Sequence, residues 1–191
     1  MRPALALAVA VLFLAALAPA GARAASVDRA LSADRSASQR AGKPLPWFGL
    51  RLGGVVAVGS AGDSTPTGGG ASLYALFDGR EFLADVAMDV YAGNRAHLIA
   101  LGLGAYYPFV AGNVTPYLGG GLKAGWTRFG GDGTFGLIPF AAGGLLVGRE
   151  GYVQVRAELA WFVAVSREDR ADRPQGSARA TGPLITLGLA F

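Results

Sequence analysis

The chain has 191 residues, of which 52% are hydrophobic, only 16% are charged and 30 are glycine, and this composition is too apolar and glycine-rich for an ordinary soluble domain. The absence of cysteine excludes a disulfide scaffold, thiol catalysis and cysteine-based metal sites. The formal net charge of +4 does not indicate a nucleic-acid partner, because the basic residues are not gathered on one periodic face.

Residues 1–24 have the three regions of a secretory signal peptide. A basic start at Arg2 precedes an apolar run over 4–18, and a small-residue sequence over 22–24 follows a proline and a glycine. We expect cleavage after Ala24, which removes two of the 17 basic residues and leaves 15 against 13 acidic ones, a net charge of +2. A retained transmembrane anchor is the alternative. An acylated start is excluded because a lipoprotein needs a cysteine at the cleavage point.

Residues 25–45 are small, polar and charged, and they contain too few large apolar side chains to bury a face. We expect a flexible polar leader here. From residue 46 onward, apolar runs alternate with turn-forming or charged clusters, and their glycine and β-branched content predicts strands. The eight predicted strands span 46–60, 69–78, 80–93, 97–108, 115–129, 136–149, 151–165 and 182–191.

A membrane helix over residues 98–122 is an alternative, because this segment carries no charge and is long enough to span a bilayer. Pro108, Pro116 and six glycines interrupt it, and a helix with so many breakers is improbable. We therefore expect two strands and a turn in this segment.

The connections between the predicted strands alternate in character. Short joins follow the second, fourth and sixth strands, and longer or more polar joins follow the first, third, fifth and seventh. This alternation, with an even number of strands, is typical of barrels that span the bacterial outer membrane. The sequence therefore predicts an all-β, eight-stranded antiparallel up-and-down transmembrane β-barrel over 46–191, with both termini on the periplasmic, short-turn side.

The predicted strands have one apolar and one polar face. In the strand at 151–165 the odd positions are apolar, whereas Gln154, Arg156 and Glu158 stand at even positions, and the first, third and fifth strands alternate in the same way. Unpaired charges in a closed interior are costly, so the near-balanced signs predict mutual pairing. The alternative is a soluble sheet with a solvated face. The predicted ion-pair network in the lumen consists of Arg51, Glu81, Asp85, Asp89, Lys123, Arg156 and Glu158.

Aromatic residues concentrate near the predicted strand ends, which indicates two girdles at the membrane interfaces. The expected periplasmic girdle is Trp47, Phe48, Phe77, Phe82, Tyr106, Tyr107, Phe109, Tyr117, Tyr152 and Phe191. The expected outer girdle is Tyr91, Trp126, Phe129, Phe135, Phe140, Trp161 and Phe162. Tyr74 lies in mid-strand.

The glycines of GGVVAVG and LGGGLKAG match no phosphate-binding loop, and we expect them to relieve crowding inside a narrow barrel.

From residue 46 to 191 the chain resembles the small eight-stranded outer-membrane barrels of the OmpA and OmpX type. The resemblance is carried by the final strand ITLGLAF, which ends in Phe191, and by the YYPF and TPYLGGGLKAGW segments over 106–126. It implies an integral protein of the cell outer membrane. It also implies that Phe191, with Leu189 and Leu187 on the same face, is the signal that the barrel-assembly machinery recognises.

Enzymatic chemistry has little support in the sequence. The only histidine is His97. Lipid A deacylases have a His-x-Ser pattern, but in this sequence Ile99 stands in place of the serine. The odd register also directs His97 away from the lumen. Asp85 and Asp89 are about 13 Å apart along a strand, too far to share a proton. We predict no catalytic residue, cofactor or metal site.

Eight strands enclose an interior just wide enough for side chains, so a general diffusion pore is not expected. Function then lies in the outer loops, of which 166–180 is the longest. Its arginines are candidates for contact with lipopolysaccharide phosphates or with an unknown surface partner: Arg167, Arg170, Arg173 and Arg179.

The sequence predicts a non-enzymatic outer-membrane barrel that contributes to envelope integrity or surface interaction. The expected partners are outer-membrane lipid and lipopolysaccharide, with no nucleic acid. One alternative is a soluble periplasmic lipocalin-like barrel that binds an apolar ligand, which requires the large apolar residues to point inward. The other alternative is a lipid A-modifying barrel enzyme.

Overall fold

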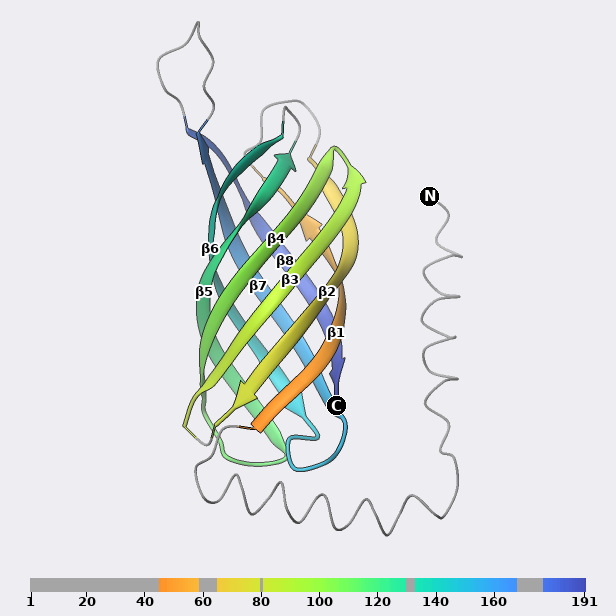
Figure 1. The fold of residues 1–191 in the computed structure, drawn as a ribbon, viewed down its shortest axis with the longest axis vertical. Helices are drawn as coiled ribbons and strands as arrows, with labels where there is room; N and C mark the ends of the chain where they lie inside the picture. Colours follow the sequence, from red (N-terminus) through yellow and green to blue (C-terminus); the bar gives the residue numbers. More distant parts are fainter. Residues whose placement is uncertain (1–44, 59–64, 80, 130–132, 168–176) are drawn as a thin grey trace, which may run out of the picture.

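The computed structural model describes residues 45–58, 65–79, 81–129, 133–167 and 177–191. In these residues eight antiparallel strands pair in chain order and the last pairs with the first, which makes a closed barrel (Figure 1). The predicted all-β, eight-stranded up-and-down fold is confirmed. The strands are β1 (Leu45–Val56), β2 (Thr67–Asp78), β3 (Leu83–Asn94), β4 (Ala96–Pro108), β5 (Val114–Phe129), β6 (Thr134–Val147), β7 (Gln154–Arg167) and β8 (Ser177–Ala190).

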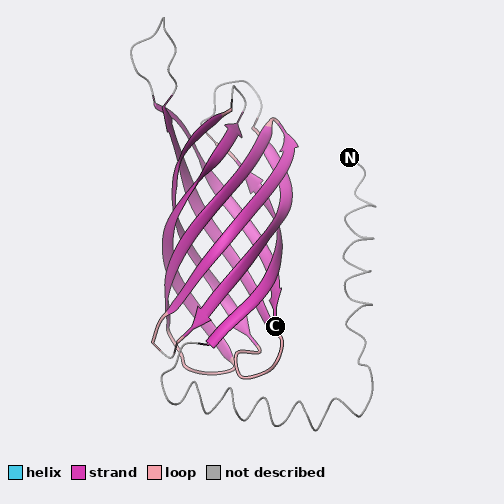
Figure 2. Cartoon of the chain, viewed as in Figure 1, coloured by secondary structure: helices cyan, strands magenta, loops and turns pink. Residues whose placement is uncertain are grey.

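The described chain consists of strands joined by loops (Figure 2). We call the end that carries Phe191 and the joins after β2, β4 and β6 the turn end, and the opposite end the loop end. Within the described ranges, no helix has the length and apolar character needed to cross a membrane. The predicted signal peptide over 1–24, and all but the last residue of the predicted leader over 25–45, lie outside the described residues.

The β7–β8 hairpin is longer than predicted. These strands stay paired from Gln154 opposite Ala190 to Arg167 opposite Ser177, so β8 begins before its predicted start at residue 182. The polar composition of this segment predicted a loop. Continued pairing satisfies the backbone N–H and C=O groups of both strands, and this requirement outweighs the polar composition.

The barrel closes between β1 and β8. Their ladder runs from Gly49 opposite Ala190 to Val55 opposite Leu184. At the turn end the Phe191 N–H donates to the Phe48 carbonyl at 2.9 Å, and the Phe48 N–H donates to the Phe191 carbonyl at 3.2 Å. Phe191 is therefore paired to the first strand, and this pairing closes the sheet over the length of the β1–β8 ladder.

The two faces of the strands have opposite character. Leu103 and Ile185 are each 64% exposed on the outside, whereas Arg156 on the inside is 1% exposed. Large apolar residues normally lie inside a soluble fold and charges lie outside. The lipocalin-like alternative, which requires the large apolar residues to point inward, does not fit this arrangement.

Interior glycines make room for larger side chains. A Cβ added at Gly104 would lie 2.5 Å from both the Asp85 carboxylate and the Tyr106 hydroxyl, and one added at Gly53 would lie 2.7 Å from the Thr186 side chain. These separations are shorter than real Cβ contacts, so an alanine at either position forces its neighbours to move. The glycines therefore relieve crowding, as the sequence predicts.

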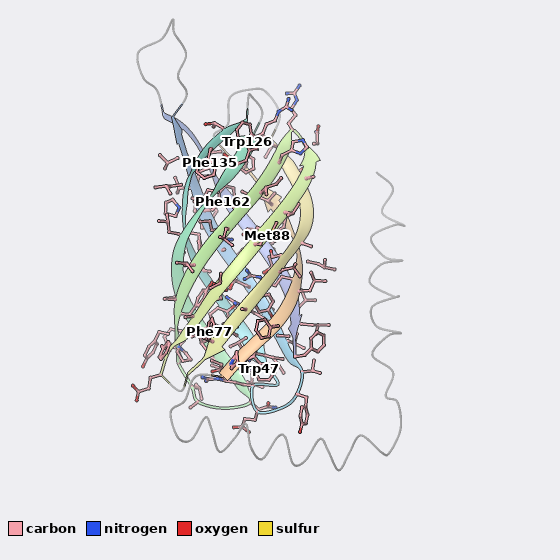
Figure 3. All side chains as sticks on the ribbon, in the orientation of Figure 1. Trp47, Phe77, Met88, Trp126, Phe135 and Phe162 are labelled. Carbon is pink, nitrogen blue, oxygen red and sulfur yellow. The ribbon has the colours of Figure 1, made fainter. Side chains whose placement is uncertain are left out.

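The predicted aromatic girdles are only partly correct. Exposed rings do lie outside at both ends, among them Phe77 at the turn end and Trp126 and Phe135 at the loop end (Figure 3). Other predicted girdle members are buried and point inward: Trp47, Tyr91, Tyr106, Tyr117 and Phe162. Phe129 and Phe140 are partly buried and pack against the interior cluster. Each inward residue lies an even number of positions from the other buried residues of its strand, and this alternation decides the direction of a strand side chain whatever its height.

Candidate functional site

Six charged side chains meet inside the barrel. All six project from the odd-numbered strands β1, β3, β5 and β7, and all are buried. Three are cations and three are anions, so their formal charges cancel. They are Arg51, Lys123 and Arg156 with Asp85, Asp89 and Glu158. We call this group the lumen network.

Arg156 is the centre of the lumen network. Its Nη1 lies 2.7 Å from Oδ2 of Asp85, and its Nη2 pairs with Glu158. Its Nε donates to the Tyr117 hydroxyl at 2.8 Å, and that hydroxyl donates to Oε2 of Glu158 at 2.8 Å. The guanidinium also lies 4.7 Å from the ring centroid of Tyr106. Arg156 therefore binds two carboxylates and contacts aromatic rings at once, which the point charge of a lysine cannot match.

Arg51 connects the remaining members. Its Nη1 lies 3.3 Å from Oε1 of Glu158 and 3.5 Å from Oδ2 of Asp85, and its Nη2 lies 3.9 Å from Oδ1 of Asp89. Lys123 pairs with the other oxygen of Asp89. Asp85 and Asp89 thus share Arg51 as a bridging cation. The six groups form one connected set of alternating charge.

Glu81 does not belong to the lumen network, and its prediction is wrong. The residue lies in the join between β2 and β3, before the start of β3 at Leu83, and its side chain is exposed. It has the parity of Asp85 and Asp89, but alternation between faces applies only within a strand. A carboxylate beyond the strand end stays in water, because burial without a partner would cost several kcal/mol.

The even-numbered strands supply tyrosines to the lumen network. The Tyr106 hydroxyl of β4 donates to Oδ2 of Asp85 at 3.1 Å, and the Tyr74 ring of β2 lies 4.8 Å from the Arg51 guanidinium. Sequence analysis missed the roles of Tyr74, Tyr106 and Tyr117. The available signal was the alternation of faces along a strand. Tyr117 lies an even number of residues from Lys123 on the same strand, so both side chains point to the same face.

A separate buried ion pair, outside the lumen network, lies at the turn end. Arg149, in the join after β6, donates to Oδ1 of Asp78 from Nε at 2.9 Å and from Nη2 at 2.6 Å. It also donates to the carbonyls of Val110, in the join after β4, and of Gly79, in the join after β2. Gln154 donates to the same Asp78 carboxylate at 3.5 Å. One arginine therefore links all three joins at this end, and sequence analysis did not single out Arg149 or Asp78.

Aromatic and apolar side chains fill the interior toward the loop end. The Phe129 and Phe162 rings stack with centroids 5.6 Å apart, and the Ser72 and Tyr91 hydroxyls are hydrogen-bonded at 3.1 Å. The interior thus contains three successive sets of side chains. They are the Arg149–Asp78 pair at the turn end, the lumen network, and this aromatic set.

The loop arginines are only partly described. Arg170 and Arg173 lie outside the described residues. The backbone of Arg167 ends β7, and that of Arg179 lies in β8 opposite Val165. These two positions belong to strands, which corrects the prediction that both lie in a loop over 166–180.

The predicted assembly signal lies on the outer face of β8. Leu187 and Phe191 are exposed, and Leu189 is partly buried. His97 is also exposed on the outer face, with exposed Ile99 at the next outward position of β4. In the part of the chain that the structure describes, no group of three or more histidine, aspartate or glutamate residues is arranged to hold a metal ion.

No protein-family model and no curated protein matches the chain. Among solved structures, Neisserial surface protein A is similar to this chain, with a TM-score of 0.59, 16% identity and coverage of 76% of this chain and 95% of that one. The N-terminal β-barrel domain of Pseudomonas aeruginosa OprF matches with a TM-score of 0.49, 12% identity and coverage of 78% and 100%. Ail, the attachment invasion locus protein of Yersinia pestis, matches with a TM-score of 0.45, 10% identity and coverage of 76% and 97%. The likeness to the first of these, together with the closed eight-stranded sheet, shows the fold of the small outer-membrane barrels.

Proposed function

We propose that the protein is a non-enzymatic integral barrel of the outer membrane that contributes to envelope integrity or surface interaction. One observation carries this proposal. The described outer wall exposes large apolar side chains such as Leu101 and Leu187, whereas the lumen network is buried inside. Exposure of these apolar side chains to water is unfavourable, whereas contact with the hydrocarbon of a membrane is favourable. Ion pairing within the lumen network satisfies the interior charges.

The packed interior favours a role at the surface over transport. Arg156 and Trp47 are among the largest buried side chains, and they fill the space that a diffusion pore would need. The protein therefore acts through its outer wall and its loops, with lipid and lipopolysaccharide as its surroundings. Arg167, Arg170, Arg173 and Arg179 are proposed lipopolysaccharide contacts, because arginine matches the geometry of phosphate oxygens.

Fractionation of cells that express the full chain tests the outer-membrane location. We expect the protein in the outer-membrane fraction, resistant to carbonate and high salt, with different gel mobility in boiled and unboiled samples. The physical reason is that a closed barrel keeps its backbone hydrogen bonds in detergent until it is heated. Release by carbonate or high salt without detergent would contradict the proposal.

Deletion of Phe191 tests the proposed assembly signal. The deletion removes both hydrogen bonds between Phe48 and Phe191 as well as an exposed ring. We expect severalfold less heat-modifiable protein in the outer-membrane fraction, because the seam between β1 and β8 loses its last pair and the machinery loses its signal. Phe109→Ala is the matched control, since Phe109 is an exposed ring at the same end. Normal insertion of the deletion variant would count against a signal role.

A further inference from the structure

The Nε atom of Arg51 is a buried hydrogen-bond donor that the lumen network leaves unsatisfied. Arg51 is 3% exposed, and its Nη1 lies near the carboxylates of Glu158 and Asp85. Among the described residues, no atom accepts a hydrogen bond from Nε. In a planar guanidinium, Nε and Nη2 donate from one shared edge, and Nη1 donates largely away from it. The contacts of Nη1 therefore do not account for the donors on the Nε–Nη2 edge.

An unsatisfied acceptor lies beside this edge. Asp89 is fully buried, and its Oδ2 pairs with Lys123. Its Oδ1 has no hydrogen-bond partner among the described residues and lies 3.9 Å from Nη2 of Arg51. That separation is within the range of an ion pair but is too long for a direct hydrogen bond. A donor edge and an acceptor oxygen thus lie near each other without a direct hydrogen bond between them.

Ser72 lies between the two groups, on the intervening strand. In the ladder it stands opposite Arg51 of β1 on one side and opposite Asp89 of β3 on the other. Its side chain is short and buried, and its hydroxyl is hydrogen-bonded to the Tyr91 hydroxyl at 3.1 Å. A hydroxyl has one donor and two acceptor positions, so this bond leaves Ser72 able to make another. We call Arg51, Ser72 and Asp89 the inner rung.

The charges of the inner rung select the class of ligand. A group bound here must accept a hydrogen bond from Arg51 and donate one to Asp89. The Asp89 carboxylate repels an anion, and the Arg51 guanidinium repels a cation. Water is neutral, both donates and accepts, and joins atoms about 4–5 Å apart through two hydrogen bonds. Buried waters typically bind about three polar groups, and the inner rung supplies three.

We propose that the inner rung is a binding site for one buried water molecule. The water accepts from the Arg51 Nε–H group and donates to Oδ1 of Asp89, and the Ser72 hydroxyl is its third partner. It extends the hydrogen bonds of the lumen network through Ser72 to Tyr91 and so to the aromatic set toward the loop end. It also joins the Lys123–Asp89 pair to Arg51 by hydrogen bonds as well as by charge. The inference goes beyond the proposed function, because it depends on the barrel interior and not on the cellular location.

Crystal structures of the full chain, folded in detergent, test the site. The unmodified protein is compared with Ser72→Val, which removes the hydroxyl and adds carbon volume at the centre of the inner rung. Tyr91→Phe is the matched control, because it removes the other partner of Ser72 and leaves the inner rung intact. Further crystals of the unmodified protein contain rubidium and bromide, whose anomalous scattering distinguishes a bound ion from water. The gel shift between boiled and unboiled samples shows that each variant is folded.

We expect one density peak in the unmodified protein and in Tyr91→Phe, at about 2.7–3.2 Å from Arg51 Nε and from Asp89 Oδ1. Ser72→Val should lack this peak, because its side chain occupies the space and offers no polar partner. A direct hydrogen bond between Arg51 and Asp89, with no peak between them, would overturn the inference. So would an anomalous signal at the site, or an unchanged peak in Ser72→Val. If Ser72→Val does not fold, the unmodified protein and Tyr91→Phe still decide the outcome.

Discussion

Replacing Arg156 with methionine is expected to destabilise the folded barrel by about 3–5 kcal/mol, the usual cost of removing one partner from a buried ion pair. The substitution keeps most of the side-chain volume but removes the cation that binds Asp85 and Glu158. Among the described residues, the remaining cation paired with these two buried carboxylates is then Arg51, at 3.3 Å from Glu158 and 3.5 Å from Asp85. The measurement is the urea midpoint of the barrel refolded into lipid vesicles, followed by tryptophan fluorescence and by gel mobility.

Two further variants separate the effect of charge from that of packing. Adding Glu158→Gln to Arg156→Met restores equal numbers of cations and anions in the lumen network, so we expect part of the lost stability to return. Lys123→Met should cost less than Arg156→Met, because Lys123 pairs with one carboxylate, that of Asp89, whereas Arg156 pairs with two. An unchanged midpoint for Arg156→Met, or equal losses for all three variants, would mean that the network does not act as a coupled unit.

Replacing Arg149 with methionine is the second substitution with a large expected effect, again about 3–5 kcal/mol. Asp78 is fully buried and would lose its bidentate partner. The joins that contain Gly79 and Val110 would also lose their shared donor, so their backbone amides should exchange faster with solvent. Urea midpoints measure the overall loss, and amide hydrogen exchange locates it at the turn end.

The adjacent residue provides the control for this prediction. Glu150 lies in the same join and is exposed, so Glu150→Gln should change stability by no more than about 0.5 kcal/mol. Equal urea midpoints for Arg149→Met and Glu150→Gln would show that Arg149 does not hold the three joins together. Faster amide hydrogen exchange at the loop end alone would show the same.

The sequence by itself determined the strands and their faces. Side chains alternate with a period of two along a strand, so the apolar odd positions of β7 and the polar even positions Arg156 and Glu158 indicate both the strand and its orientation. The same reasoning placed the two aspartates of β3 inside. It failed for Glu81, which lies beyond the strand end. For Trp47 and Tyr117, position near a strand end predicts a place in the outer girdle, but alternation between the two faces of the strand directs both side chains inward.

Tertiary structure alone decided which side chains meet. Arg51 of β1 binds carboxylates on β3 and β7, although its paired neighbours are β2 and β8. Arg149 binds Asp78, 71 residues away in the sequence. The physical reason is that parity is a property of one strand, whereas the relative height of side chains on unpaired strands depends on the stagger around the closed barrel. That stagger exists only once all eight strands have paired, and it brings the six charges of the lumen network into contact.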